Sequence, residues 1–125
     1  MTRSPPAGNI ATKRIYEEPA AEDGKRVLVD ALWPRGVAKK DAQLDGWFRE
    51  IAPGAELRRW FGHDPKRWCQ FRRRYRAQLA GQQEALDRLR RLAQAGKLTL
   101  VYGARDERHN NAIVLKDILL GQPGP

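Results

Sequence analysis

The stretch KLTLVYG, residues 97–103, contains the clearest strand in the chain and decides how the remaining sequence is interpreted. Apolar and β-branched residues fill it, and the glycines Gly96 and Gly103 bound it. A short run of this composition between turn residues is typical of a strand inside a sheet. The fold is therefore built outward from this strand.

Two further segments resemble strands. RVLVDAL, residues 26–32, is a nearly continuous apolar run, which indicates a strand buried on both faces. The following WPRG, residues 33–36, ends it, because the residue before proline is disfavoured in a helix and Gly36 permits a sharp turn. Residues 10–17 alternate β-branched or aromatic side chains with polar ones and predict a first strand.

Five segments have the spacing of helices, with apolar residues at three- and four-residue steps. Asp41 is a good N-cap for the first, and Asp64-Pro65 signals the start of the third. The apolar positions are Leu44, Trp47, Phe48 and Ile51 in the first segment, residues 56–61 in the second, Trp68, Phe71, Tyr75 and Leu79 in the third, Ala85, Leu86, Leu89, Leu92 and Ala93 in the fourth, and Ala112, Leu115 and Leu119 in the last.

Strands separated by long helical segments predict the α/β class. We expect a small, mostly parallel sheet of about three to four strands flanked by helices, in a single compact three-layer domain with a helical middle segment. Proline and glycine near both ends predict a flexible N-terminal tail over residues 1–9 and a C-terminal tail over residues 121–125. Residues 10–120 then form the one domain.

The composition places the chain among globular proteins. Of its 125 residues, 41% are hydrophobic and 31% charged, and no run approaches the roughly 20 apolar residues of a transmembrane helix. The N-terminus lacks the apolar core of a secretory signal. Cys69 is the only cysteine, which excludes an intramolecular disulfide and fits a reducing compartment. We expect a cytoplasmic protein with no membrane partner.

The chain is strongly basic. It has 24 Lys and Arg against 15 Asp and Glu, a net charge of +9 and a pI near 10.3. This charge favours polyanionic partners, nucleic acid first, although an arginine-rich composition alone also produces it. Arg72, Arg73, Arg74 and Arg76 cluster in sequence, but on a helix four such positions spread around most of the circumference.

Two predicted strands end in loops rich in functional groups. In an open parallel sheet, ligands bind outside the carboxyl ends of the strands, where the next helix also offers free N–H groups. Parallel packing would place both loops on one rim, so that Arg35, Arg105 and His109 converge on one cleft. The first loop supplies Asp30, Trp33, Arg35 and Gly36, and the second supplies Tyr102, Arg105, Asp106, His109, Asn110 and Asn111.

Several of these residues have an ordinary structural interpretation. Asp106 or Asn110 could simply cap the last helix, and Asp30 could form a structural bridge with Arg35 or another arginine. His63 and Asp64, in WFGHDP, are secondary candidates, because a packed turn histidine and a helix cap are the favoured interpretation there. His109 is the better functional histidine, since it lies at a helix start beside charged groups and an imidazole can act as an acid or a base.

Other site chemistries find little support. No metal-ligand spacing such as HxxxH or paired CxxC is present, so no metal site is predicted, and the cofactor stays open. Neither a P-loop nor GxGxxG follows the strands, which argues against ordinary nucleotide hydrolysis and Rossmann dinucleotide binding. Cys69 has no histidine at helical spacing and is not expected to act as a nucleophile.

Three blocks of the chain form a recognisable set, in this order: RVLVDALWPRGVAK (26–39), ELRRWFGHDPKRW (56–68) with FRRRY (71–75), and LVYGARDERHNNAIVL (100–115). Together they resemble the domain-of-unknown-function family 488, in its YeaO-like branch. The resemblance covers roughly residues 10 to 120 and implies a small bacterial cytosolic α/β protein with no settled activity. The family's first block typically reads V-D-R-L-W-P-R-G, so Ala31 replaces an arginine while Asp30, Trp33 and Arg35 match.

Three functional hypotheses follow. The first is a rim pocket for an anionic, phosphate-bearing ligand. Arg35 and Arg105 would hold the anion, Trp33, Gly36, Tyr102, Asn110 and Asn111 would line the pocket, and His109 would serve as acid or base oriented by Asp30 or Asp106. The second is a non-catalytic nucleic-acid-binding protein that uses the basic helix 66–76 and Arg88, Arg90 and Arg91. The third is a structural or protein-interaction domain. Whether the protein is an enzyme, and its oligomeric state, stay open.

Overall fold

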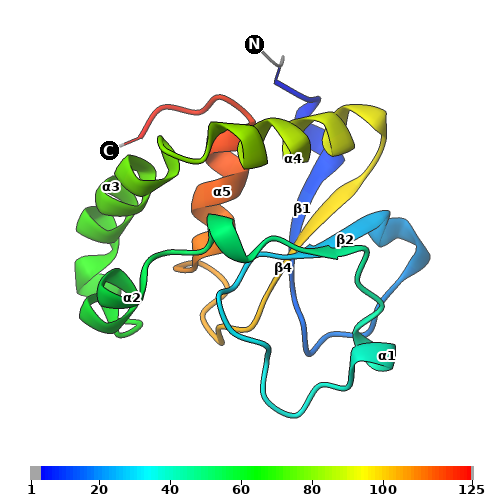
Figure 1. The fold of residues 1–125 in the computed structure, drawn as a ribbon, viewed down its shortest axis with the longest axis horizontal. Helices are drawn as coiled ribbons and strands as arrows, with labels where there is room; N and C mark the ends of the chain where they lie inside the picture. The colour runs from blue at the N-terminus through cyan, green and yellow to red at the C-terminus, as the bar shows by residue number, and fades with distance from the viewer. Residues whose placement is uncertain (1–3, 125) are drawn as a thin grey trace.

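The computed structural model describes residues 4–124, and within them four parallel strands form one sheet (Figure 1). The strands are β1 (Ile10–Arg14), β2 (Lys25–Leu28), β3 (Gly46–Trp47) and β4 (Leu98–Tyr102), in the order β1-β4-β2-β3. The strand predicted from KLTLVYG lies at the centre, with Leu100 paired to Thr12 on one side and Val27 on the other. The α/β class and the parallel sheet are confirmed.

Five α-helices complete the described part of the chain. They are α1 (Lys39–Ala42), α2 (Ala55–Phe61), α3 (Trp68–Leu79), α4 (Gln83–Ala95) and α5 (Asn111–Leu119), with short 3-10 turns at residues 7–9, 21–23, 49–51 and 65–67. None of the helices in residues 4–124 has the length and hydrophobicity that a membrane span requires. The predicted tails include residues 1–3 and 125, which lie outside the described residues. Within the tails, Asn9 donates to the Ala93 carbonyl and the Gln122 carbonyl accepts from Arg76.

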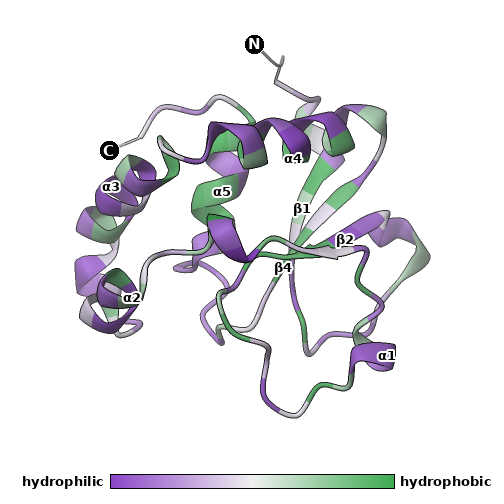
Figure 2. Cartoon of the chain, in the orientation of Figure 1, coloured by the Kyte–Doolittle hydropathy of each residue, from purple (hydrophilic) through white to green (hydrophobic). Residues whose placement is uncertain are grey.

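The main core lies between the sheet and helices α2 to α5. Successive side chains of a strand point to opposite faces, so Val27, Leu98 and Leu100 face these helices. The helices contribute apolar stripes that include Phe71, Tyr75, Leu86, Leu89 and Leu115, all nearly inaccessible to solvent. Figure 2 shows the same pattern, with α5 largely hydrophobic and the outward sides of α3 and α4 hydrophilic.

A second, smaller core covers the opposite face of the sheet. Leu28, Val101 and Ile15 pack there against Trp33 and Trp47, whose rings meet edge to face with centroids 5.4 Å apart. The covering layer is the loop segment 31–47, whose regular elements are the short α1 and the two-residue edge strand β3. The third layer of the domain is therefore mostly irregular chain.

The prediction of a helix from Asp41 through Ile51 is wrong. Helix α1 ends at Ala42, and Gln43 has a left-handed backbone with φ of 48°. The chain then becomes extended and pairs with β2 as the edge strand β3. Trp47 packs on one face of the sheet while Phe48 and Ile51 pack on the other. The apolar residues of this segment are divided between the two cores, and their three- and four-residue spacing resembles that of a helix only by chance.

A buried ionic cluster connects the β2 strand to two loops. Arg26 is only 3% exposed, and its side chain donates to the Asp23 carboxylate at 2.7 Å and to the Ala42 carbonyl at 2.9 Å. Lys13 also bonds Asp23, at 3.1 Å. Burial opposes ionisation of Asp23, but hydrogen bonds from the Ala20 N–H, Lys13 and Arg26 outweigh it and hold its pKa below the usual value. Arg26 thereby fixes the loop that carries the second core.

Replacing Asp23 with Asn should destabilise the fold by about 2 kcal/mol, because it leaves the Arg26 charge buried without its counter-charge. This is below the roughly 3–5 kcal/mol typical of fully buried pairs, since the Lys13 side chain, 18% exposed, opens the cluster toward solvent. Urea unfolding measures the change, with Glu22→Gln on the exposed side of the same turn as control. Equal midpoints for Asp23→Asn and wild type would contradict the role given to this cluster.

Candidate functional site

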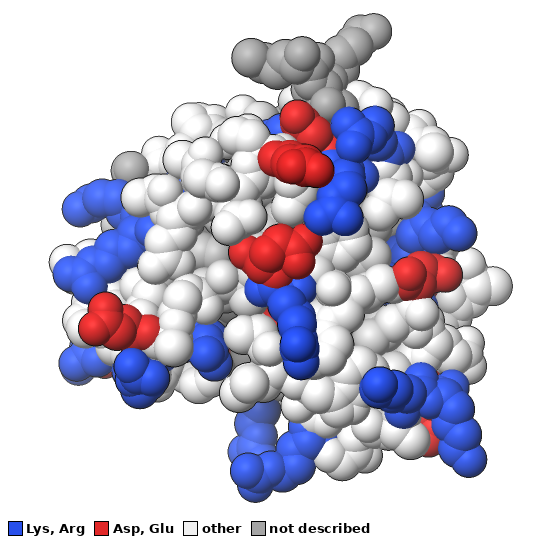
Figure 3. All heavy atoms as spheres, in the orientation of Figure 1, with Lys and Arg blue, Asp and Glu red and all other residues white. Residues whose placement is uncertain are grey.

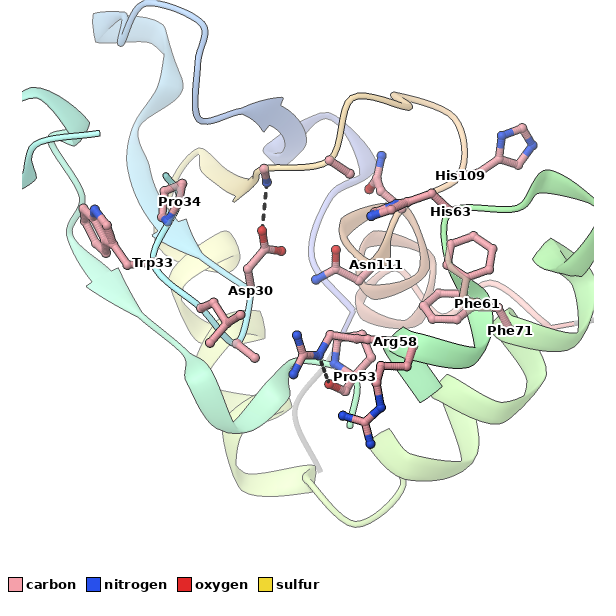
Figure 4. A pocket seen from close by; sticks show the side chains of 16 residues that line it. Asp30, Trp33, Pro34, Pro53, Arg58, Phe61, His63, Phe71, His109 and Asn111 are labelled. Atoms are coloured by element: carbon pink, nitrogen blue, oxygen red, sulfur yellow. Dashed lines mark hydrogen bonds between the residues drawn. The ribbon is translucent and has the colours of Figure 1, made fainter. Parts of the chain in front are cut away.

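A cleft of about 460 Å³ opens where β2 and β4 end, at the carboxyl rim of the sheet (Figure 4). The loop after β2 forms one wall, and helix α2 with the turn behind it forms the other. The start of α5 and the residues just after β4 complete the lining. The lining residues are Asp30, Ala31, Leu32, Trp33, Pro34, Pro53, Arg58, Arg59, Phe61, His63, Phe71, Gly103, Ala104, His109, Asn110 and Asn111.

Asp30 is fixed at the point where the two central strands leave the sheet. Its Oδ2 accepts a hydrogen bond of 2.8 Å from the Gly103 N–H (Figure 4). A Cβ at Gly103 would lie 3.3 Å from that oxygen, so glycine allows the backbone to approach the carboxylate closely. Asn111 joins the third element, since its Nδ2 donates to the Val29 carbonyl at 2.9 Å. Strands β2 and β4 and helix α5 are thus tied together around one carboxylate.

Burial raises the pKa of the Asp30 carboxyl above its ordinary value. Hydrogen bonds from Gly103 and the Asn111 side chain, and the nearby Arg58 and His63, oppose this shift without cancelling it. The same neighbours show that Asp30 and the α2 wall interact electrostatically across the cleft. An acid held in a cleft at an energetic cost is a frequent feature of ligand sites.

The α2 wall brings cationic side chains to the cleft. The Arg58 Nε donates to the Pro53 carbonyl at 3.2 Å, which holds the guanidinium on the cleft side (Figure 4). Arg59 follows it and is exposed at the mouth. Helix α2 ends at Phe61 with Gly62 as its C-cap, and the following His63 has a φ of 56°, a left-handed conformation that is uncommon for residues other than glycine. Backbone strain of this kind often accompanies functional sites.

The elbow after β4 is organised by its own side chains. Asn110 is the N-cap of α5, with its Oδ1 accepting from the Ile113 N–H at 3.1 Å, so the predicted capping role is confirmed for this residue. Asp106 accepts from the N–H groups of Arg108 and His109, and its Oδ2 lies 2.8 Å from the His109 Nδ1. These bonds, with that of the Arg108 N–H foremost, lower the pKa of Asp106.

His109 is held between this carboxylate and an aromatic ring. Its imidazole meets Trp68 edge to face, with centroids 5.3 Å apart. Figure 4 places the His109 ring at the edge of the cleft and the Asp30 carboxylate well inside it. The arrangement is a positioned Asp–His pair at the rim and does not bring His109 and Asp30 together.

The structure gathers half of the predicted site residues in this cleft. Those that line it are Asp30, Trp33, His63, His109, Asn110 and Asn111. Those outside the lining are Arg35, Gly36, Asp64, Tyr102, Arg105 and Asp106.

The predicted residues outside the lining have other surroundings. Arg35 is exposed, and its carbonyl accepts from the Tyr16 hydroxyl at 3.0 Å. Arg105 is exposed in the elbow, and Tyr102 is buried in the main core. Asp64 caps the turn before α3 by accepting from the Lys66 N–H at 3.0 Å.

Sequence reasoning missed Arg58 and Arg59. They belong to the short helix expected over residues 56–61, and nothing local indicates which rim that helix faces. A pair of arginines ahead of an aromatic pair in ELRRWF was the available signal. Among the described residues, no three histidine, cysteine, aspartate or glutamate side chains gather closely enough to hold a metal ion.

Replacing Asp30 with Asn should stabilise the protein near neutral pH and raise its Tm by a few degrees. The amide oxygen of the asparagine can still accept from Gly103, but the substitution removes a carboxylate whose ionisation folding disfavours. Below the ordinary pKa of 3.8 both forms are neutral and the difference should vanish. The stability difference between the variant and wild type should grow as pH rises from 3.8 through the raised pKa of the folded state. Thermal unfolding between about pH 3 and 8 tests this. A variant less stable than wild type at neutral pH would show instead that Asp30 is kept for structure.

Comparison with known proteins places this chain in a family. A family model described as the inactive DUF488-N3 subclade matches residues 9–123. The chain is 43% identical over 111 residues to Uncharacterized protein YeaO of Escherichia coli K12, which covers 89% of this chain and 96% of that protein. It is 37% identical over 113 residues to an uncharacterized protein of Mycobacterium tuberculosis H37Rv, covering 90% and 95% respectively. A comparison with solved structures gave no significant match. The chain therefore belongs to the YeaO-like DUF488 family.

Proposed function

We propose that the cleft binds a small phosphate-bearing anion. The observation that carries this proposal is that three basic side chains reach the cleft from one short segment, the Arg58, Arg59 and His63 of α2 and its following turn. Guanidinium groups suit phosphate because they present a fixed fork of donors. A cleft of about 460 Å³ at the carboxyl rim of a parallel sheet has the size and place of many small-molecule sites.

The proposal reassigns the anion-holding role. Arg35 and Arg105 were the predicted pair, but Arg58 and Arg59 are the arginines that line the cleft. The Arg58 Nε is used by the Pro53 carbonyl, which orients the side chain and leaves its terminal nitrogens for a ligand. Arg59 adds a second cation at the mouth, where it also attracts anions from solvent.

The proposal is a binding role without an assigned reaction. The matching family model is described as inactive, which favours binding over turnover. The acid or base role of His109 stays a prediction, and the Asp106–His109 pair, 2.8 Å apart, is the geometry on which it rests.

Titration calorimetry with inorganic phosphate tests the proposal at low salt. Arg58→Gln and Arg59→Gln should each weaken binding by about tenfold or more, because each removes a charge-assisted contact. Arg105→Gln is the matched control, being an exposed arginine of the same rim that lies outside the cleft lining. Thermal unfolding confirms that all three variants are folded. If the Arg58 and Arg59 variants bind phosphate as wild type does, or if wild type binds none, the proposal is wrong.

A second candidate function is nucleic-acid binding on the surface formed by residues 55–79, the α2–α3 face. It is favoured by the distribution of charge, since this segment holds eight Lys and Arg against Glu56 and Asp64, a net +6 of the chain's +9. Figure 3 shows blue side chains gathered over α2 and α3. Arg88 and Arg90, expected to contribute, are instead paired with Glu50 at 2.9 Å and Asp87 at 3.1 Å. The proposed basic surface is therefore limited to the α2–α3 face and does not extend to these two arginines of α4.

This candidate predicts affinity for labelled single- and double-stranded DNA that falls steeply with salt, because phosphate contacts release counterions. The double variant Arg73→Gln, Arg74→Gln, both exposed on α3, should reduce the affinity several-fold and flatten the salt dependence. Arg88→Gln with Arg91→Gln on α4 removes the same charge from outside the face and is the control. Fluorescence anisotropy measures both. Equal losses in the two double variants would indicate a general charge effect and remove the α2–α3 face as a nucleic-acid surface.

A further inference from the structure

The floor of the cleft differs chemically from its mouth. At the mouth, Arg58 and Arg59 supply donors and positive charge. At the floor, Asp30 supplies only acceptors when it is ionised, and the Gly103 N–H occupies its Oδ2. Figure 4 shows the second carboxylate oxygen of Asp30 directed away from Gly103, toward the side of the cleft that holds Asn111. A phosphate cannot sit against this oxygen, so the floor must receive a different part of the ligand.

Asn111 adds a second acceptor beside Asp30. Its Nδ2 donates to the Val29 carbonyl at 2.9 Å, and the same amide also hydrogen-bonds the Asp30 carboxylate, so that both contacts fix its orientation. The Oδ1 is the opposite end of the same amide and is left as an acceptor. Two adjacent acceptors on a rigid floor complement a ligand with neighbouring hydroxyl donors, as a sugar has. Carboxylates hold ribose hydroxyls in this way in other α/β proteins.

The walls of the cleft are apolar. Phe61 and Phe71 stack with ring centroids 4.3 Å apart behind the cleft, and both are buried in the main core. Pro34 and Pro53 line it as well. At the rim, Leu32 is 67% exposed, a large apolar surface left to solvent beside the opening. A ligand made only of sugar and phosphate would leave Leu32 exposed, whereas a flat heteroaromatic group would cover it.

We infer that the ligand is a nucleoside monophosphate, whose ribose hydroxyls donate to Asp30 and Asn111, whose base packs on the exposed Leu32 at the rim, and whose phosphate meets Arg58 and Arg59. This inference rests on the proposed phosphate site and adds the chemistry of the rest of the ligand. The cleft volume of about 460 Å³ accommodates one such molecule. Neither a P-loop nor a dinucleotide fingerprint is needed, because side chains replace the backbone phosphate cradle.

Titration calorimetry with AMP, GMP, CMP and UMP tests the inference against inorganic phosphate and ribose 5-phosphate. At least one nucleotide should bind about tenfold tighter than inorganic phosphate. Its 2′-deoxy or 3′-deoxy form should bind about tenfold more weakly than the ribonucleotide, which is the loss of one hydrogen bond to a charged group. Asp30→Asn should abolish this hydroxyl preference while keeping phosphate affinity, because it removes the acceptor charge but not the arginines. Asp41→Asn, at an exposed position of α1, should keep the preference.

The outcomes separate the inference from the proposed function. If phosphate and ribose 5-phosphate bind in an Arg58-dependent manner but no nucleotide binds tighter, the anion site stands and the nucleotide inference is wrong. If nucleotides bind tighter but the deoxy forms and Asp30→Asn leave the affinity unchanged, the role given to Asp30 is wrong. If no compound binds, both proposals are wrong.

Discussion

The hydrogen bond from the Gly103 N–H to the Asp30 carboxylate is the contact on which the rim of this molecule depends. It joins the chain at the points where β2 and β4 leave the sheet, and the Asn111 bond to Val29 adds α5 to the same joint. The loops that follow therefore start from fixed positions. The cleft lies between these loops and the wall formed by α2 and its following turn.

This joint is held at a cost. Burial raises the pKa of Asp30, which means that folding disfavours the ionised carboxylate even with Gly103, Asn111, Arg58 and His63 nearby. A neutral amide could make the Gly103 bond equally well, so structure alone does not require an acid. A carboxylate at this position therefore fits a role for Asp30 in contacting a ligand in the cleft. The left-handed backbone of His63, on the opposite wall of the cleft, is likewise an energetically unfavourable feature at this site.

The buried ions on the other side of the sheet serve a different purpose. Arg26 and Asp23 lie in the layer away from the cleft, and Arg26 bonds the Ala42 carbonyl as well as Asp23. The loop segment 31–47 covers the second core and contains little regular secondary structure. The hydrogen bonds of Arg26 therefore hold this segment against the sheet. The same segment begins beside Asp30 and carries the cleft residues up to Pro34. The contacts that hold segment 31–47 on the second core therefore also help to fix the loop after β2 that lines the cleft.

The sequence by itself determined the α/β class, the parallel sheet around residues 98–102, a helix cap at Asp106 or Asn110 and the family, and the structure chose Asn110 as the cap. These depend on local signals: apolar runs bounded by turn residues, side chains that satisfy helix ends, and motif blocks in order. Only the tertiary structure decided that Leu44 to Ile51 is not a helix, because its apolar side chains serve cores on opposite faces of the sheet. It also decided which arginines reach the cleft. Arg35 and Arg105 are next to the right strands in sequence, but Arg58 and Arg59 lie there because α2 packs across the rim, and no local pattern encodes that long-range contact.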